Sequence, residues 1–315
     1  STTTSTPSLG IKATTGVNTI AGGGTKSFEE KNVLATEVAL TENIRGIATD
    51  KDGNVYFADE DAGYIAMVNG EGKLNVVAKD LSHPIGLVVN NAGDVFVAEN
   101  GSTKQITRLT KKSDGTYEKK SYTSDTFVNI YSITLSNSDP NILYIGDAQN
   151  PDIEDDKSVL KQMEISTGTI SSLTELTDVI DTAGIITDAN NNLYIADYAD
   201  ANEGKGKLFK YDLKNKKVTT LAENLTSPDG LVMDASGNLY LAVDNDKILK
   251  YDTSLKQSVF AGGGEKGRET NGNTRTQVSL GELEMVAMTA NKDSKGEPTL
   301  YYVDKTAKLI REINP

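Results

Sequence analysis

Six acidic residues each end a short apolar segment, and this recurrence is the most regular chemical feature of the sequence. Gathered at one place, six carboxylates would form a negative ring that attracts cations or a basic partner. The structural alternative is that each carboxylate accepts hydrogen bonds from backbone amides of its own turn. An acid that recurs in every segment favours this second interpretation. The residues are Asp59, Glu99, Asp147, Asp197, Asp244 and Asp304.

A second set of residues precedes the apolar segments that lead to these acids, and it does not repeat. Its members are Arg45, Ile85, Tyr131, Ala183, Asp229 and Glu284. Irregular residues inside a regular repeat are where we expect a specific function. For Asp229, the competing interpretation is a solvated or turn-capping carboxylate. The predicted ligand-binding residues are Arg45, His83, Tyr131, Asp229 and Glu284.

His83 is the only histidine, and a lone histidine could act as a general base. It lies in Leu81-Ser-His-Pro-Ile-Gly86, which aligns with Leu225-Thr-Ser-Pro-Asp-Gly230. The chain shows no Ser/His/Asp order and no nucleophile elbow. We therefore predict no catalytic residue and expect a non-enzymatic protein.

Two loops are rich in acids and are the weak candidates for metal binding. Calcium prefers clustered oxygen ligands, but neither loop has the spacing of an EF-hand. Solvated loop charge is the preferred interpretation. The sequence thus predicts no cofactor, and calcium is the one ion that the loops could bind. The candidate ligands are Asp152, Glu154 and Asp156 in the first loop and Asp200 and Glu203 in the second.

Repeated hairpins must position these residues. Residues 46–59 read as an apolar strand, a tight Asp-x-x-Gly-Asn turn and a second apolar strand. Glycine and asparagine tolerate the positive φ that such a turn requires. Copies begin at 46, 86, 184 and 230, and looser copies begin at 132 and 285. Repeats of 40 to 55 residues built from short strands are typical of propeller blades.

Two further strands follow the hairpins, as at 64–68 and 74–78. The last unit has only a third strand, at 308–314. The N-terminal segment 17–24 resembles the fourth strand of the fifth unit, at 258–264. The prediction is an all-β, six-bladed propeller of four-stranded antiparallel blades over residues 17–315, closed when the N-terminal strand completes the last blade. Residues 1–16 are expected to form a flexible Ser/Thr-rich tether.

The composition of the chain restricts the kinds of site and the classes of partner that it can have. The chain has 315 residues and no cysteine, which excludes disulfides and thiolate metal sites. A net charge of −13 disfavours nucleic acid and anionic membrane surfaces. No apolar run is long enough to span a membrane. The Ser/Thr/Pro-rich start is typical of exported or surface-anchored proteins, and we expect an extracytoplasmic, bacterial monomer.

The pattern Ile-Ala-Gly-Gly-Gly, the segment Ala-Thr-x-x-x-Leu and then Gly-Ile-Ala-x-Asp-x-x-Gly-Asn resembles the NHL-repeat family of six-bladed propellers. The third and sixth units depart from it, because they lack the glycine opening and have longer turns. The resemblance implies a binding face around the central channel, where the first strands begin and the second strands end.

The segment Ser227-Pro-Asp-Gly230 is also similar to one in gluconolactonase-type propellers, whose aspartate is a metal ligand. That resemblance implies a Glu and two Asn as the other ligands. Arg45 and Ala183 hold positions where such ligands should stand, so the metal site is expected to be absent.

The expected function is an extracytoplasmic binding module that offers the acidic channel face to a protein, a peptide or a glycan. The alternative is a metal-dependent, lactonase-like hydrolase or lyase that uses Asp229, neighbouring acids and His83. A purely structural spacer is a third possibility.

Overall fold

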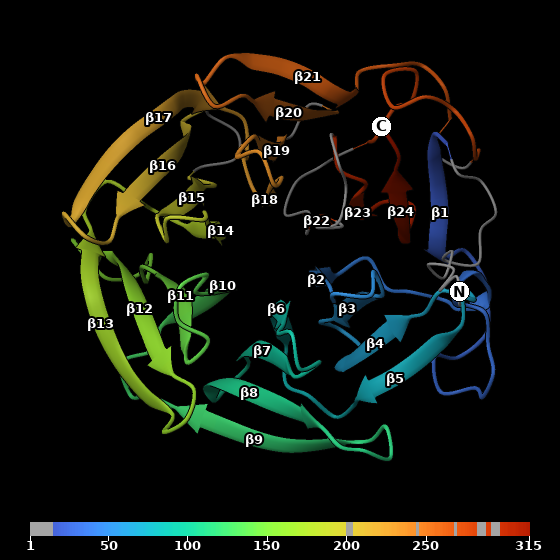
Figure 1. Cartoon of the computed structure of the whole chain (residues 1–315), viewed down its shortest axis with the longest axis horizontal. Coiled ribbons are helices and arrows are strands. Elements are labelled where there is room, and N and C mark those ends of the chain that lie inside the picture. Colours follow the sequence, from blue (N-terminus) through green and yellow to red (C-terminus); the bar gives the residue numbers. More distant parts are fainter. Residues whose placement is uncertain (1–14, 200–203, 244–245, 268–269, 282–287, 291–296) are drawn as a thin grey trace, which may run out of the picture.

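The computed structural model describes residues 15–199, 204–243, 246–267, 270–281, 288–290 and 297–315. Six four-stranded antiparallel sheets surround a central channel as the blades of a propeller (Figure 1). The predicted fold class is confirmed. A short 3-10 helix, η1 (Ala35–Glu37), interrupts the strands, and no helix of the described residues is long and apolar enough to cross a membrane.

Blades 1 to 6 are numbered from the first complete hairpin, and each is given from its inner to its outer strand. Blade 1 consists of β2 (Ile44–Thr49), β3 (Val55–Asp59), β4 (Tyr64–Val68) and β5 (Leu74–Ala78), and blade 2 consists of β6 (Pro84–Val89), β7 (Val95–Asn100), β8 (Lys104–Lys111) and β9 (Tyr117–Thr123). Blade 3 consists of β10 (Asn129–Leu135), β11 (Ile142–Ala148), β12 (Ser158–Glu164) and β13 (Thr169–Leu176), and blade 4 consists of β14 (Thr182–Thr187), β15 (Leu193–Asp197), β16 (Gly206–Asp212) and β17 (Lys217–Leu225). Blade 5 consists of β18 (Leu231–Met233), β19 (Leu239–Val243), β20 (Lys247–Tyr251) and β21 (Gln257–Gly262), and blade 6 consists of β22 (Met288–Ala290), β23 (Leu300–Asp304), β24 (Leu309–Ile313) and β1 (Val17–Gly22).

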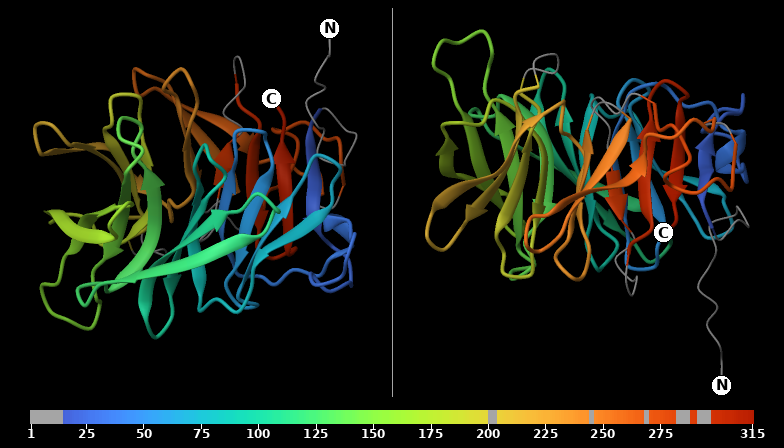
Figure 2. Two further views of the ribbon diagram at one scale, coloured as in Figure 1. Left: turned by 60° about the horizontal axis from the view of Figure 1, so that its bottom comes forward. Right: turned by 90° about the horizontal axis from the view of Figure 1, so that it is seen from above.

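The two ends of the chain meet in blade 6. Strand β1 pairs antiparallel with β24, from Val17 opposite Ile313 to Gly22 opposite Leu309. Figure 2 shows β1 in the ring beside the last strand. The predicted closure by the N-terminal strand is confirmed. Of the predicted tether, only residues 15 and 16 lie among the described residues, and Asn314 N donates to Gly16 O at 3.1 Å.

The repeated Asp-x-x-Gly-Asn turn is a network of side-chain hydrogen bonds. Asp50 Oδ1 accepts from the amides of Asp52 and Asn54 at 2.9 and 3.0 Å. Its Oδ2 accepts from Asn54 Nδ2 and from Tyr56 OH at 2.8 and 3.1 Å. Gly53 supplies the positive φ of 83°. The same bonds form around Asp188 and Asp234, so each copy pins its own hairpin.

The glycine that opens each hairpin lets neighbouring blades pack closely at the channel. A Cβ on Gly46 would lie 1.9 Å from Ile85 O, and one on Gly184 would lie 2.3 Å from Asp229 O. In blade 3 the glycine is replaced by Ser132, whose Oγ donates to Thr182 O of blade 4 at 2.7 Å. The irregular opening of the third unit is therefore an inter-blade hydrogen bond.

Candidate functional site at the channel mouth

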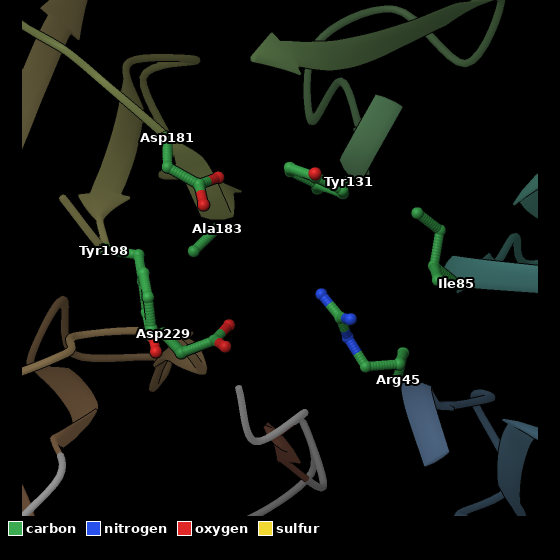
Figure 3. Close-up of a pocket in the computed structure, with 7 residues that line it drawn as sticks. All are labelled: Arg45, Ile85, Tyr131, Asp181, Ala183, Tyr198 and Asp229. Carbon is green, nitrogen blue, oxygen red and sulfur yellow. The ribbon is translucent and has the colours of Figure 1, made fainter. Parts of the chain in front are cut away.

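A small polar pocket opens at one mouth of the channel (Figure 3). Its volume of about 20 Å³ accommodates one water-sized group. This space has the size of a single functional group and is much smaller than the sites that enclose drug-sized molecules. The lining residues come from blades 1 to 5 and are Arg45, Ile85, Tyr131, Asp181, Ala183, Tyr198 and Asp229.

β-Bulges aim three of these side chains into the channel. In blade 1, Ile44 pairs with Asp59 and Gly46 with Ala58, so Arg45 is the extra residue without a ladder partner. Tyr131 and Ala183 occupy the same place in blades 3 and 4. A bulge twists the strand locally and re-aims its side chain, which is why bulges are common beside functional sites.

Arg45 is the cation of the pocket. Its Nη1 lies 3.6 Å from Glu60 Oε2, and its guanidinium carbon lies 5.9 Å from the centre of the Tyr131 ring. The other oxygen of Glu60, Oε1, lies 3.4 Å from His83 Nδ1. Glu60 therefore connects the pocket to His83.

His83 does not line the pocket, and its side chain is 60% exposed. Its φ of +49° matches the +47° of Ser227, and both residues precede a proline. The predicted alignment of the two segments thus holds in the backbone. It places the histidine side chain at the rim of the pocket, where its Nδ1 faces Glu60.

Sequence reasoning missed two residues of the pocket, Asp181 and Tyr198. Asp181 lies in the loop before β14, two positions ahead of Ala183, and Tyr198 directly follows β15. The carboxyl group of Asp181 points into the pocket (Figure 3), and Tyr198 lines the same pocket as Asp229. The available signal was an acid directly before the inner strand, in Asp181-Thr-Ala-Gly184. The fifth predicted residue, Glu284, lies outside the described residues.

Both aspartates of the pocket hold their protons unusually tightly. Burial raises the pKa of Asp181 to about 6; the charge of Asp197 adds to this rise, and Arg45 opposes it. Burial also raises the pKa of Asp229 well above its ordinary value, against the influence of Arg45. Burial raises the pKa of Tyr131 as well. Carboxyl groups with displaced pKa values in a concave site are typical of functional positions.

We expect Asp181→Asn to stabilise the protein above pH 6. An aspartate with a pKa of about 6 when folded and about 3.9 when unfolded binds more protons in the folded state between these values, so its contribution to stability falls as pH rises. The asparagine side chain does not ionise, so the variant does not lose this stability as pH rises. After allowance for partial exposure, the gain is roughly 1–2 kcal/mol at pH 7.5 and vanishes near pH 4. Urea unfolding at pH 4, 6 and 7.5 measures it.

Asp178→Asn is the matched control, because Asp178 is exposed and lies only three residues upstream. It should change the free energy of unfolding by less than about 0.5 kcal/mol at every pH. A destabilised Asp181→Asn at pH 7.5 would show that the carboxylate is structural.

The acids that end the second strands are buried and hydrogen-bonded, so they do not form a solvent-facing ring. Asp59, Glu99, Asp147, Asp197 and Asp304 are each at most 2% exposed. Most of their donors lie in the loop that enters the blade, as when Ser82 N donates to Glu99 Oε1 at 2.8 Å. Some lie in the acid's own turn, as when Ala62 N donates to Asp59 Oδ1. Asp244 lies outside the described residues. The structural interpretation fits these contacts, with donors further away than predicted.

The weak metal candidates that the structure describes, Asp152, Glu154 and Asp156, do not form a metal-binding group. Asp152 and Glu154 are exposed, and Asp156 Oδ2 accepts from Asn150 N within its own loop at 2.7 Å. Asp200 and Glu203 lie outside the described residues. Across the described part of the chain, no group of three His, Cys, Asp or Glu side chains is placed to hold an ion.

Comparison with known proteins identifies the family. The family model described as "SMP-30/Gluconolactonase/LRE-like region" matches residues 46–260. The chain belongs to this family. The NHL resemblance therefore indicated the correct kind of propeller but named a related, different family. No curated protein matches the sequence of this chain.

Solved structures share the propeller fold of this family member at low sequence identity. An auxiliary nutrient binding protein from Bacteroides ovatus has a TM-score of 0.69 and 14% identity, over 95% of this chain and 76% of that one. A putative gluconolactonase has a TM-score of 0.61 and 14% identity, over 95% and 92%. Virginiamycin B lyase from Staphylococcus aureus has a TM-score of 0.56 and 15% identity, over 86% and 95%.

The pocket does not fit the metal that the gluconolactonase resemblance implies. A divalent ion needs several oxygen or nitrogen donors, whereas Ala183 offers none and Arg45 brings a positive charge. Asp229 lines the pocket, but the guanidinium of Arg45 is close enough to lower its pKa. The described lining residues therefore do not match the ligand set that the resemblance implies.

Proposed function

We propose that this propeller is a non-enzymatic, extracytoplasmic binding protein whose ligand inserts one polar group into the channel-mouth pocket. The observation that carries the proposal is the joint presence of Arg45, Tyr131, Asp181 and Asp229 around one water-sized cavity. Charged hydrogen-bonding groups give orientation, and an aromatic ring gives contact area, which together suit a polar ligand. The cavity takes one group, so the rest of a peptide or glycan would lie on the surrounding face.

The names of two structural neighbours are compatible with this role. Both are described as auxiliary nutrient binding proteins of Bacteroides species, with TM-scores of 0.69 and 0.67. At 14% identity these proteins and this chain share the fold alone, so their names do not identify the ligand of this pocket.

The proposal is tested by presenting labelled full-length protein to glycan and peptide arrays, followed by titration of the best ligand. Asp229→Asn and Tyr131→Ala should weaken binding at least tenfold. Lys79→Gln is the control, because Lys79 is an exposed cation that follows the outer strand of blade 1. Binding should weaken with added salt and should not respond to a chelator. Array ligands that bind both pocket variants as tightly as the wild type would refute this choice of site.

A hydrolase or lyase remains the second candidate, favoured by one observation. Burial raises the pKa of Asp229, and general acids of the carboxyl type have pKa values raised in this way. His83 cannot assist it at the pocket, since it lies at the rim. Turnover of a lactone that is abolished by Asp229→Asn would favour this candidate over simple binding.

A further inference from the structure

The carboxyl group of Asp181 lacks a donor that a ligand could supply. Its Oδ1 is buried and makes no hydrogen bond to any described residue. A buried acceptor without a partner is unfavourable, because it has lost its hydrogen bonds to water and gained none from the protein. The carboxyl group points into the pocket, as does that of Asp229 (Figure 3). A ligand that donates hydrogen bonds would therefore complement these two carboxyl groups.

Charge selects among the possible donors. Arg45 is already engaged by Glu60 at 3.6 Å, so it does not fully balance the two pocket aspartates. An anionic ligand would face both aspartates and a chain of net charge −13. A divalent ion would meet too few oxygen donors in the described lining. A neutral hydroxyl group donates only one hydrogen bond.

We propose that the pocket binds the primary ammonium group of a small ligand between Asp181, Asp229 and the rings of Tyr131 and Tyr198. An ammonium group is compact, donates three hydrogen bonds and carries one positive charge. These properties match a cavity of about 20 Å³ with two carboxyl groups and two aromatic side chains in its wall. This assignment rests on the proposed binding function and specifies its ligand.

Ammonium binding is coupled to proton release. Burial favours the neutral carboxyl forms of Asp181 and Asp229 in the empty pocket. An ammonium group stabilises their ionised forms, so the aspartates release protons to the buffer while the ligand keeps its own. Affinity should therefore increase as pH rises through about 6. Two other charged groups act on Asp181: the carboxylate of Asp197 adds to the rise in its pKa, and Arg45, which pairs with Glu60 at 3.6 Å, opposes it.

Matched amine and amide ligands test the assignment. The probes are glucosamine against N-acetylglucosamine and ethanolamine against N-acetylethanolamine, titrated by NMR into the full chain at constant ionic strength. Each amine should bind at least tenfold more tightly than its acetylated partner, and more tightly at pH 7.5 than at pH 5.5. The sugar and the simple amine show whether a ring adds affinity.

Two variants complete the test. Asp181→Asn, which is expected to fold at least as stably as the wild type, should weaken amine binding about tenfold, whereas Asp178→Asn should not. Equal binding of amine and amide, with loss in Asp229→Asn, overturns the ammonium assignment and leaves the binding function standing. The assignment is also overturned if Asp181→Asn and Asp229→Asn bind the amines as tightly as the wild type does. It is likewise overturned if neither amine saturates the protein up to 100 mM. The binding function itself falls only if the array ligands ignore the pocket variants.

Discussion

Removal of residues 1–24 is expected to abolish cooperative folding of the propeller. The deletion takes away β1 and exposes the edge of β24, whose partners run from Val17 to Gly22. Val17 and Ile20 are at most 2% exposed, and burial of each such side chain contributes about 1.5–3 kcal/mol. Together with the lost ladder bonds, this approaches the whole stability of about 5–15 kcal/mol of a typical domain. Circular dichroism melting and the yield of soluble protein measure the effect.

A shorter deletion separates the strand from the segment before it. Removal of residues 1–14 leaves β1 intact and should shift the melting temperature by no more than about 2 °C. A synthetic peptide of residues 15–24, added to the truncated chain, should restore part of the cooperative transition by strand addition. The closed ring would lose its support if the chain lacking residues 1–24 melted like the intact protein.

The fold could be predicted from the sequence because the same hairpin pattern occurs six times in it. Six copies of one hairpin reveal the blade, and a strand missing at the C-terminus with a matching strand at the N-terminus reveals the closure. The regular positions also follow from local chemistry, since Asp50, Gly53 and Asn54 each have a role inside their own turn.

The site was only partly readable because it depends on register. Arg45, Tyr131 and Asp229 were predicted at the channel, and they line one pocket. The bulges that aim Arg45 and Tyr131 arise from one-residue shifts in strand pairing, which apolar alternation does not reveal. Asp181 stands two residues before the bulge of its blade, as Asn43 and Asn129 do in theirs, and alignment of the repeats does not show which of these side chains enters the pocket.

Lys161→Met is expected to destabilise the protein by about 3–5 kcal/mol, the usual cost of leaving a buried charge without its partner. Lys161 Nζ lies 2.6 Å from Asp147 Oδ2 and also donates to Thr126 O at 2.7 Å. The two side chains of the pair are only 4% and 2% exposed. Asp147 accepts further bonds from the amides of Val128 and Asn129, so it would stay buried with its charge only partly balanced. Urea unfolding at pH 7.5 measures the loss.

Lys157→Met is the matched control, because Lys157 precedes the same strand and pairs with Glu175 at 3.6 Å on the surface. An exposed pair of this kind contributes about 0–1 kcal/mol. Addition of Asp147→Asn to Lys161→Met should recover part of the lost stability, since it removes the unbalanced charge while keeping an acceptor for the amides. The single variant Asp147→Asn tests whether this acid serves recognition. If it leaves the free energy of unfolding unchanged and removes binding of an array ligand, Asp147 takes part in recognition. If it lowers the free energy of unfolding and binding is retained, Asp147 stabilises the fold, and recognition depends on Asp181, Asp229 and Tyr131.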